Sequence, residues 1–386
     1  MTRARQSLAI TLLAALSISP QMGHAHPDTA HFSDTAFVSE PKIVECTLTD
    51  GTENDCYEIT VGYLPEGLEI GPFCPATLED AGGLWDWTGE DAGVYRIDGD
   101  FLRFLNELGY AFYDADGNVH FTDLTDRPDV ENSCIAVVPD EDVEMTVLLP
   151  VTPVMAETPT DLGTVSQAGI ALNGAPIFAD APSVQDTGNL PALDLCGGHI
   201  DPGGWYHWHA TATDIQGLLD AEGIEATCGL AQDPTALFGY AFDGFGMYGT
   251  QDPDGAVPTD LDACNGHVGP VPGSDEEVYH YHATNTFPNL PACLVGLSPE
   301  NAFATTASAG LGSQSRDGSI QGPGGSGKGT PPGFDEAAEA LGVTTEALLE
   351  AMRSSGGGRP DLDAAAETLG VSEADLREAL PPPPNQ

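Results

Sequence analysis

Basic side chains are scarce in this chain. Its 386 residues include 60 aspartates and glutamates but only 11 lysines and arginines, and the only lysines are Lys42 and Lys328. The formal net charge of −49 argues against nucleic acids and anionic membrane surfaces as partners, because both repel an acidic protein. We expect a solvated acidic surface suited to a saline medium rather than a dedicated acidic face that binds cations.

Long hydrophobic runs are also missing, with one short exception at the N-terminus. Residues 1–25 have the pattern of a secretory signal peptide. Arg3 and Arg5 precede an apolar stretch over residues 8–18, and a small-residue cleavage site ends at Ala25. No apolar stretch reaches the ~20 residues that a membrane span needs. We therefore expect an exported protein, periplasmic or extracellular, with no membrane span.

Eight cysteines, an even number, are expected to form disulfides because the destination of an exported protein is oxidising. Their positions predict the bonds Cys196–Cys228 and Cys264–Cys293, each of which would clamp one histidine motif. The alternative is that these thiolates bind a metal. The pairing of the remaining four is left open: Cys46, Cys56, Cys74 and Cys134.

Two parts of the chain carry nearly the same histidine motif. Residues 193–199 read Leu-Asp-Leu-Cys-Gly-Gly-His and are followed by Tyr-His-Trp-His-Ala-Thr at 206–211. Residues 261–267 read Leu-Asp-Ala-Cys-Asn-Gly-His and are followed by Tyr-His-Tyr-His-Ala-Thr at 279–284. Imidazole is the commonest protein ligand for zinc and copper. The repeat therefore predicts copper or zinc binding, with six candidate ligands: His199, His207, His209, His267, His280 and His282.

Strand geometry predicts how these imidazoles are arranged. In a β-strand, residues i and i+2 point to the same face, so His207 projects with His209, and His280 with His282. A third imidazole from each Gly-His turn would complete a set of three nitrogens. Such a set leaves one position of tetrahedral zinc open for water or substrate.

Several features of this array have more than one interpretation. Asp194 and Asp262 either accept a hydrogen bond from a ligating imidazole or cap the turns in which they lie. The six histidines form either one shared site or two separate sites. The alternatives to metal binding are a hydrogen-bonded polar network and metal-free acid–base catalysis. The occurrence of the histidine set in two spaced copies favours metal binding.

The duplication extends beyond the histidines. Residues 169–178 match residues 239–248, and each copy places an Asn-Gly or Asp-Gly pair between apolar residues, which is a strong hairpin signal. We predict a mainly β, internally duplicated and disulfide-bonded domain over residues 161–300. Its two related halves are expected to face each other about a pseudo-dyad.

The flanking regions differ from this domain. Residues 26–160 show short alternating runs that predict a β-rich, disulfide-bonded region with one helix at 100–109. Residues 301–333 are rich in Gly, Ser and Pro and are predicted to form a linker. Residues 334–386 hold a small α-helical repeat in which Ser372 and Asp375 form a capping pair. This tail is a spacer, an incidental addition or a binding element for a protein partner.

One sequence in the linker imitates a nucleotide-binding loop. Gly329 stands where that motif needs Ser or Thr, and two prolines at 331–332 block the helix that should follow. We therefore expect no nucleotide partner.

The combined motifs resemble those of YHYH-domain proteins, a secreted bacterial family whose name is spelled by residues 279–282. The resemblance covers residues 160–300, including the two hairpins and Phe-Pro-Asn-Leu-Pro-Ala-Cys at 287–293. In the first copy Trp208 replaces the second tyrosine, on the strand face opposite to the imidazoles. The resemblance implies a secreted protein with this domain and does not specify a reaction.

The sequence supports three functional hypotheses. The first is an exported protein that binds copper or zinc through the duplicated histidine array. The second is a metal-dependent hydrolase in which a three-histidine site keeps one coordination position open. The third is a non-catalytic extracellular adhesion or matrix protein. Neither the choice between metals nor the oligomeric state follows from the sequence.

Overall fold

The computed structural model describes most of the chain. The described residues are 27–64, 68–122, 130–162, 166–179, 183–209, 213–226, 233–274, 277–285, 289–308, 310, 334–344, 347–348, 351 and 362–379. The predicted signal peptide and the sequence that imitates a nucleotide-binding loop lie outside them. Within the described residues, each helix is too short or too polar to cross a membrane.

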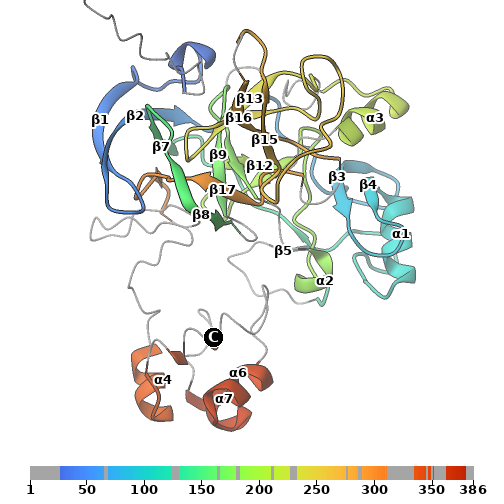
Figure 1. The fold of residues 1–386 in the computed structure, drawn as a ribbon. Coiled ribbons are helices and arrows are strands. Elements are labelled where there is room, and N and C mark those ends of the chain that lie inside the picture. The colour runs from blue at the N-terminus through green and yellow to red at the C-terminus, as the bar shows by residue number, and fades with distance from the viewer. Residues whose placement is uncertain are drawn as a thin grey trace, which may run out of the picture.

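Strands dominate the fold and confirm the mainly β prediction, with 35% of residues in strands and 14% in helices. The largest sheet has eight strands in the order β11-β12-β10-β9-β13-β14-β16-β15 (Figure 1). Their bounds are β9 (Gln167–Ala171), β10 (Pro176–Phe178), β11 (Gly198–Ile200), β12 (Tyr206–Trp208), β13 (Leu237–Ala241), β14 (Gly246–Tyr248), β15 (Gly266–Pro270) and β16 (Glu277–His282).

This sheet consists of two halves related by the predicted pseudo-dyad, but the halves lie side by side in one sheet and do not face each other. Counted from the two edges inward, β11 is equivalent to β15, β12 to β16 and β10 to β14. The antiparallel pair β9/β13 lies at the centre. Ile170 pairs with its own counterpart, Tyr240, so the axis passes between these two residues. In each half the second hairpin strand pairs in parallel with a histidine strand, β10 with β12 and β14 with β16.

Each half turns its hairpin at the predicted glycine. Gly174 and Gly244 have φ angles of 94° and 88°, a left-handed conformation that favours glycine. Their amides donate to the carbonyls of Ala171 and Ala241. The two hairpins therefore have the same turn, which brings the following segments of both halves to equivalent places.

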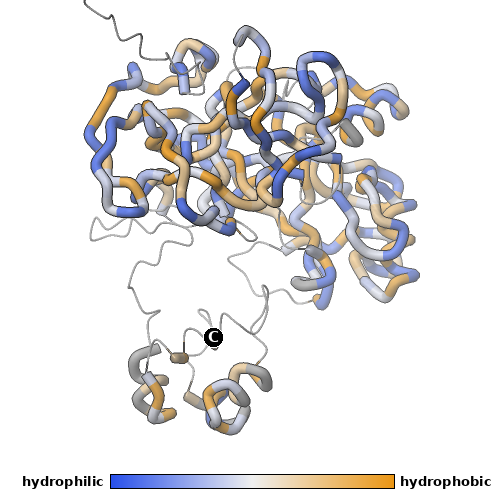
Figure 2. Tube along the Cα trace, in the orientation of Figure 1, coloured by the Kyte–Doolittle hydropathy of each residue, from blue (hydrophilic) through white to orange (hydrophobic). Residues whose placement is uncertain are grey.

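A four-stranded sheet, β1-β2-β7-β18, packs against the duplicated sheet. Its strands are β1 (Lys42–Thr47), β2 (Glu53–Gly62), β7 (Glu144–Pro150) and β18 (Phe303–Thr305). Figure 2 shows hydrophilic and hydrophobic residues following one another along β1. Met145, Val147 and Leu149 are the buried alternate residues of β7, and they share one core with Ile170 and Ile177. The N-terminal region and the duplicated unit are thus held together by a common core.

A second core lies beside the first half. It is built by β3 (Ala81–Trp87), β4 (Gly93–Asp98), α1 (Gly99–Glu107) and α3 (Thr213–Glu222). The helix predicted at 100–109 is α1, and Asp98 caps it by accepting from two backbone amides. A bridge between Leu84 and Leu193 joins this region to the segment before β11. The remaining short elements are η1 (Thr29–His31), α2 (Val184–Thr187), β5 (Phe121–Thr122), β6 (Cys134–Ile135), β8 (Met155–Asp161) and β17 (Cys293–Gly296).

Three disulfides are present among the described residues: Cys46–Cys56, Cys74–Cys134 and Cys264–Cys293. The last confirms the predicted clamp of the second histidine motif, so its two sulfurs are not metal ligands. The first two establish pairs that the sequence left open. Cys196 is buried, and its predicted partner Cys228 lies outside the described residues.

The C-terminal tail forms short helices, α4 (Phe334–Leu341), α6 (Leu362–Leu369) and α7 (Glu373–Ala379). They pack on one another around Ala337, Ala365 and Leu376. The predicted cap of α7 is confirmed, because the Asp375 amide donates to Ser372 Oγ at 3.1 Å. Figure 1 shows these helices apart from the β-rich part of the chain.

Candidate metal centres

Each histidine set arises from one antiparallel strand pair. In the first half, β11 and β12 place His199 directly opposite His207, and His209 follows two residues later. In the second half, β15 and β16 place His267 opposite His280. Residues opposite each other across a ladder, like residues two apart on one strand, share a face of the sheet. The three rings of each half consequently converge.

Site 1 consists of His199, His207 and His209. Their Nε2 atoms form a triangle with separations of 3.1 Å (His199 to His207), 2.9 Å (His207 to His209) and 3.0 Å (His209 to His199). His207 and His209 are buried, and His199 is half-buried. Phe178 and Trp205 pack against the His207 ring, with centroid distances of 4.4 and 5.0 Å. Three nitrogens thus face one another beside an aromatic wall.

Backbone carbonyls fix the proton positions of two site 1 rings. His199 Nδ1 donates to the carbonyl of Pro191 (3.1 Å), and His209 Nδ1 to that of Ala179 (2.6 Å). A carbonyl only accepts, so each neutral ring carries its proton on Nδ1 and presents a lone pair at Nε2. A proton on His207 Nε2 can point at only one of these two lone pairs. A cation between the nitrogens would satisfy all three.

Burial keeps the site 1 imidazoles neutral. It lowers the pKa of His199 to about 4 and the pKa values of His207 and His209 well below their ordinary value. Neighbouring imidazoles lower the pKa of the latter two further, because like charges repel. At neutral pH the rings are therefore in the form that binds a metal.

Site 2 consists of His267, His280, His282 and Asp252, whose ligand atoms all lie within 4.8 Å of one another. The Nε2 atoms of His280 and His282 are 2.9 Å apart. Asp252 Oδ1 lies 3.5 Å from His267 Nε2 and 3.6 Å from His282 Nε2. The histidines are buried and Asp252 is half-buried. This set has one more ligand than site 1 has among the described residues.

Each site 2 ring also has an acceptor for its Nδ1 proton. The acceptors are the Val278 carbonyl for His280 (2.9 Å), the Gly249 carbonyl for His282 (2.6 Å) and Asp260 Oδ1 for His267 (2.9 Å). When all three rings are neutral, their Nε2 lone pairs therefore meet the Asp252 carboxylate with no donor among them. Asp252 Oδ1 and His267 Nε2 have no hydrogen-bond partner within the described part of the chain. Buried acceptors in this arrangement are costly unless a cation lies between them.

The imidazoles and the carboxyl groups of site 2 differ in how their pKa values are shifted. Burial lowers the pKa of His280 to about 4 and lowers that of His282. The hydrogen bond from His267 lowers the pKa of Asp260, which is an exposed carboxyl. At neutral pH, the His280 and His282 imidazoles are therefore neutral and Asp260 is a carboxylate.

Asp252 and Asp260 are site residues that no sequence motif indicated. Both lie in the loop between β14 and β15, among other acidic residues with no distinguishing spacing. The only available signal was the position of Asp260, seven residues before the first histidine of the motif. The corresponding segment after β10, residues 180–182, lies outside the described residues.

Asp194 and Asp262 do not contact the imidazoles, which corrects one of the two interpretations given to them. Oδ1 of each accepts from the amides two and four residues ahead, at 2.9 and 3.2 Å for Asp194 and at 2.8 and 3.1 Å for Asp262. Each carboxylate also accepts a tyrosine hydroxyl at 2.9 Å, from Tyr206 or Tyr279. Both aspartates cap their turns, which was the alternative interpretation.

The six histidines form two sites rather than one. Five strand-to-strand steps separate β12 from β16, a distance of about 24 Å at ~4.8 Å per step. The pseudo-dyad relates two antiparallel neighbours and so runs perpendicular to the sheet, which places both sites on the same face.

The donor sets fit a first-row transition metal. Zinc–nitrogen bonds of about 2.0–2.1 Å in tetrahedral geometry put two nitrogens about 3.3 Å apart, and the site 1 separations of 2.9–3.1 Å are close to that value. Imidazole suits zinc, copper, iron and nickel. Calcium and magnesium prefer oxygen ligands, so the acidity of the chain does not make these sites suitable for them.

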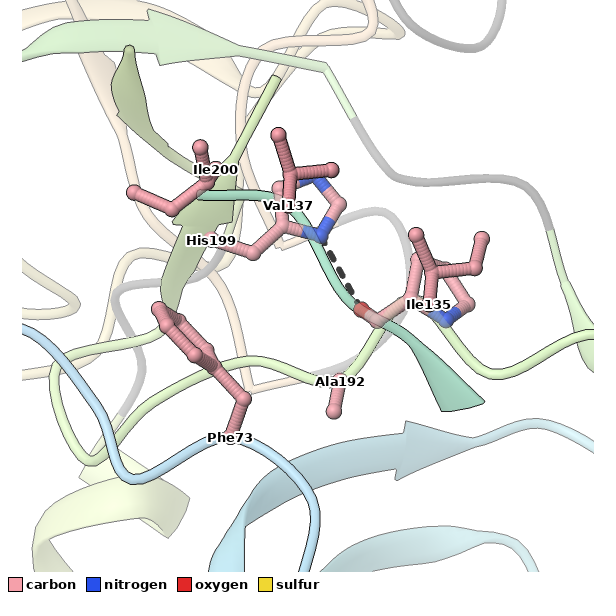
Figure 3. Close-up of a pocket in the computed structure, with 7 residues that line it drawn as sticks. Phe73, Ile135, Val137, Ala192, His199 and Ile200 are labelled. Carbon is pink, nitrogen blue, oxygen red and sulfur yellow. Dashed lines mark hydrogen bonds between the residues drawn. The ribbon is translucent and has the colours of Figure 1, made fainter. Parts of the chain in front are cut away.

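A cavity of about 20 Å³ borders site 1. Its lining residues are Phe73, Ile135, Val137, Pro191, Ala192, His199 and Ile200. Figure 3 shows this cavity and the hydrogen bond from His199 to the Pro191 carbonyl. A cavity of this size holds about one water molecule.

Comparison with known families adds one match. Residues 146–259 match the model of a family described as YHYH protein. The match includes site 1 and Asp252 but ends before His267, whereas the resemblance seen in the sequence ran over residues 160–300. Searches of curated proteins and of solved structures found no match.

Proposed function

The chain is a YHYH-domain protein, and we propose that it is an exported protein that binds copper or zinc ions at two separate sites, one in each half of its duplicated sheet. The observation that carries this proposal is the arrangement of acceptors in site 2. Three imidazole lone pairs and a carboxylate oxygen converge while each Nδ1 proton is directed to an outer acceptor. A cation at their centre satisfies all four groups together.

Site 1 supports the same function independently. It repeats the strand pairing of site 2, and His209 and His282 direct their Nδ1 protons to carbonyls at equivalent positions, Ala179 and Gly249. An adhesion or matrix role gives no reason for converging lone pairs in either half. Export is supported by three disulfides, which persist in oxidising compartments, and by the signal pattern of residues 1–25.

Elemental analysis of the purified full chain tests this function. We expect two zinc or copper ions per chain in the wild type, and one in each of His207→Gln and His280→Gln. Glutamine retains a polar side chain and limits the risk of misfolding. His120→Gln is the matched control, because His120 lies outside both sites, and it should retain two ions.

A second measurement reports on site 1 alone. Trp205 lies 5.0 Å from the His207 ring, so Cu²⁺ bound at site 1 should quench tryptophan fluorescence. Quenching should persist in His280→Gln and disappear in His207→Gln. Absence of bound metal, together with an unchanged melting temperature on addition of zinc or copper, would overturn the proposed function.

A further inference from the structure

Site 2 places a carboxylate directly beside its three imidazoles. Asp252 Oδ1 lies 3.5 Å from His267 Nε2 and 3.6 Å from His282 Nε2, so an ion held by these nitrogens also contacts this oxygen. His280 and His282 are each 1% exposed. Charges in such buried surroundings are screened much less by salt than charges on the surface. The negative charge of Asp252 therefore acts strongly on an ion in site 2.

Backbone hydrogen bonds fix the position of Asp252. Its amide donates to the Ala256 carbonyl at 2.9 Å, and the Gly255 amide donates to the Asp252 carbonyl at 2.9 Å. The neighbouring Gln251 amide donates to the carbonyl of Pro234, just before β13, at 2.8 Å. The turn that carries the carboxylate is thus closed on itself and anchored to the sheet. The carboxylate consequently faces any ion in site 2, whatever the charge of that ion.

A second carboxylate acts through the His267 ring. Asp260 Oδ1 accepts from His267 Nδ1 at 2.9 Å, and such an outer acceptor raises the basicity of the ligating imidazole. The Asp260 side chain is 71% exposed, so water screens its charge. Both carboxylates favour an ion of higher positive charge, and Asp252 does so more strongly.

Building on the proposed metal-binding function, we propose that site 2 selects the oxidation state of copper and holds Cu²⁺ in preference to Cu⁺. Coulomb attraction is proportional to the charge of the ion, so Asp252 stabilises Cu²⁺ about twice as much as Cu⁺. A carboxylate oxygen is also a hard ligand, whereas Cu⁺ is selected by soft sulfur ligands. Zn²⁺ carries the same charge as Cu²⁺ and gains the same attraction. Site 2 is thus a site for divalent ions, and copper bound there resists reduction.

The reduction potential of copper at site 2 tests this selection. The full chain with His207→Gln isolates site 2, and the same chain with Asp252→Asn added is compared with it. A loss of roughly 10²- to 10⁴-fold in Cu²⁺ affinity corresponds to about 10- to 10²-fold for Cu⁺, because the attraction is halved. The preference for Cu²⁺ then falls by about 10- to 10²-fold. At 59 mV per tenfold change for one electron, the potential should rise by about 60–120 mV.

Titration with redox mediators, followed through the electron paramagnetic resonance signal of Cu²⁺, measures the potential. It depends on the ratio of the two affinities, so a folding defect that weakens both equally does not move it. Asp254→Asn is the matched control, an exposed aspartate of the same loop, and should leave the potential unchanged. Asp260→Asn should raise it by less than Asp252→Asn.

The outcomes separate the two proposals. Copper bound with equal potentials in the Asp252 and Asp254 variants overturns the inference and leaves metal binding at site 2 intact. If the Asp252 variant retains too little copper for this titration, competition with chelating dyes gives its affinities for Zn²⁺ and Cu⁺, and equal fold-losses for both ions likewise overturn the inference. Failure of the His207→Gln chain to bind zinc or copper, with circular dichroism unchanged from the wild type, removes metal binding at site 2 and this inference with it.

Discussion

The two halves of the eight-stranded sheet share a backbone but surround their histidines differently. The cross-strand histidine pair and the Nδ1 acceptors at Ala179 and Gly249 are the same in both. The aromatic neighbour is Phe178 in the first half and Tyr248 in the second. Carboxylates contact the imidazoles of the second half, where the loop between β14 and β15 provides them. Strand pairing thus fixes where the imidazoles lie, and loops set the charge around them.

Burial of the turn before each histidine strand is a second difference. Asp194 is fully buried, because the Gly71 amide and the Leu84–Leu193 bridge bring the N-terminal region over it. Burial raises the pKa of Asp194 to about 6. Asp262, its counterpart, is exposed. The turn therefore contributes differently to stability in the two halves, although both aspartates accept from two turn amides and one tyrosine hydroxyl.

Removing the carboxylate ligand of site 2 is the strongest test of this difference between the two halves. In a His207→Gln background, Asp252→Asn should weaken binding of a divalent ion at site 2 by roughly 10²- to 10⁴-fold, since loss of one partner from a buried charge pair costs about 3–5 kcal/mol. Competition with a chelating dye measures the affinity. Asp254→Asn, an exposed aspartate of the same loop, is the control. Equal affinity in the Asp252 and Asp254 variants would show that site 2 does not use a carboxylate ligand.

A buried carboxyl present in only one half gives the second prediction. Asp243 accepts from the Tyr281 hydroxyl (2.6 Å) and the Gly296 amide (2.9 Å), and burial raises its pKa from 3.8 to about 6. The first half has Asn173 at this place. Because the folded pKa exceeds the unfolded one, the contribution of Asp243 to stability is complete only well below pH 4 and is lost as the pH rises through 6, by about 3 kcal/mol in all.

Urea unfolding of the wild type and Asp243→Asn, with disulfides intact and a chelator present, measures this effect. Between pH 4 and pH 7 the difference in unfolding free energy should move by about 2.5 kcal/mol in favour of the variant. Other titrating groups act equally on both proteins. Parallel pH profiles would show that burial does not perturb this carboxyl.

The features that could be predicted from the sequence are those that occur in it twice. The hairpin turns at 173–174 and 243–244, the pseudo-dyad and the converging imidazoles all depend on local spacing that occurs twice in the sequence. Strand period and turn chemistry determine such features, so the sequence was sufficient for them. The pair Cys264–Cys293 belongs to the same class, because the two cysteines bracket the motif.

The residues that were missed do not repeat. Asp252 and Asp260 reach site 2 because the loop between β14 and β15 folds over the histidine strands, and no local pattern specifies that path. The role of Asp194 and Asp262 was undecided for a related reason. A turn cap and a ligand-supporting carboxylate have the same position in sequence, and only the direction of the side chain distinguishes them.

A smaller effect is expected from the carboxylate behind His267. Asp260→Asn should weaken metal binding at site 2 by about 10- to 100-fold, because outer partners orient the ligating ring and raise its basicity. Binding at site 1, followed through copper quenching of tryptophan fluorescence, should not change. A loss at both sites would point to a general folding defect instead of a local role.

The smallest effects compare the two tyrosines that donate to the turn-capping aspartates. Tyr206→Phe leaves the buried Asp194 carboxylate short of one donor and should cost about 1–3 kcal/mol of unfolding free energy, since a buried group without its partner bears the full desolvation penalty. Tyr279→Phe removes a bond of the same length, 2.9 Å, but water can replace it at the exposed Asp262, so less than about 1 kcal/mol is expected. Thermal or urea unfolding of both variants gives the ratio directly. Equal losses would mean that the N-terminal region does not shield the first half, and the energetic difference between the halves would then lie in the loops alone.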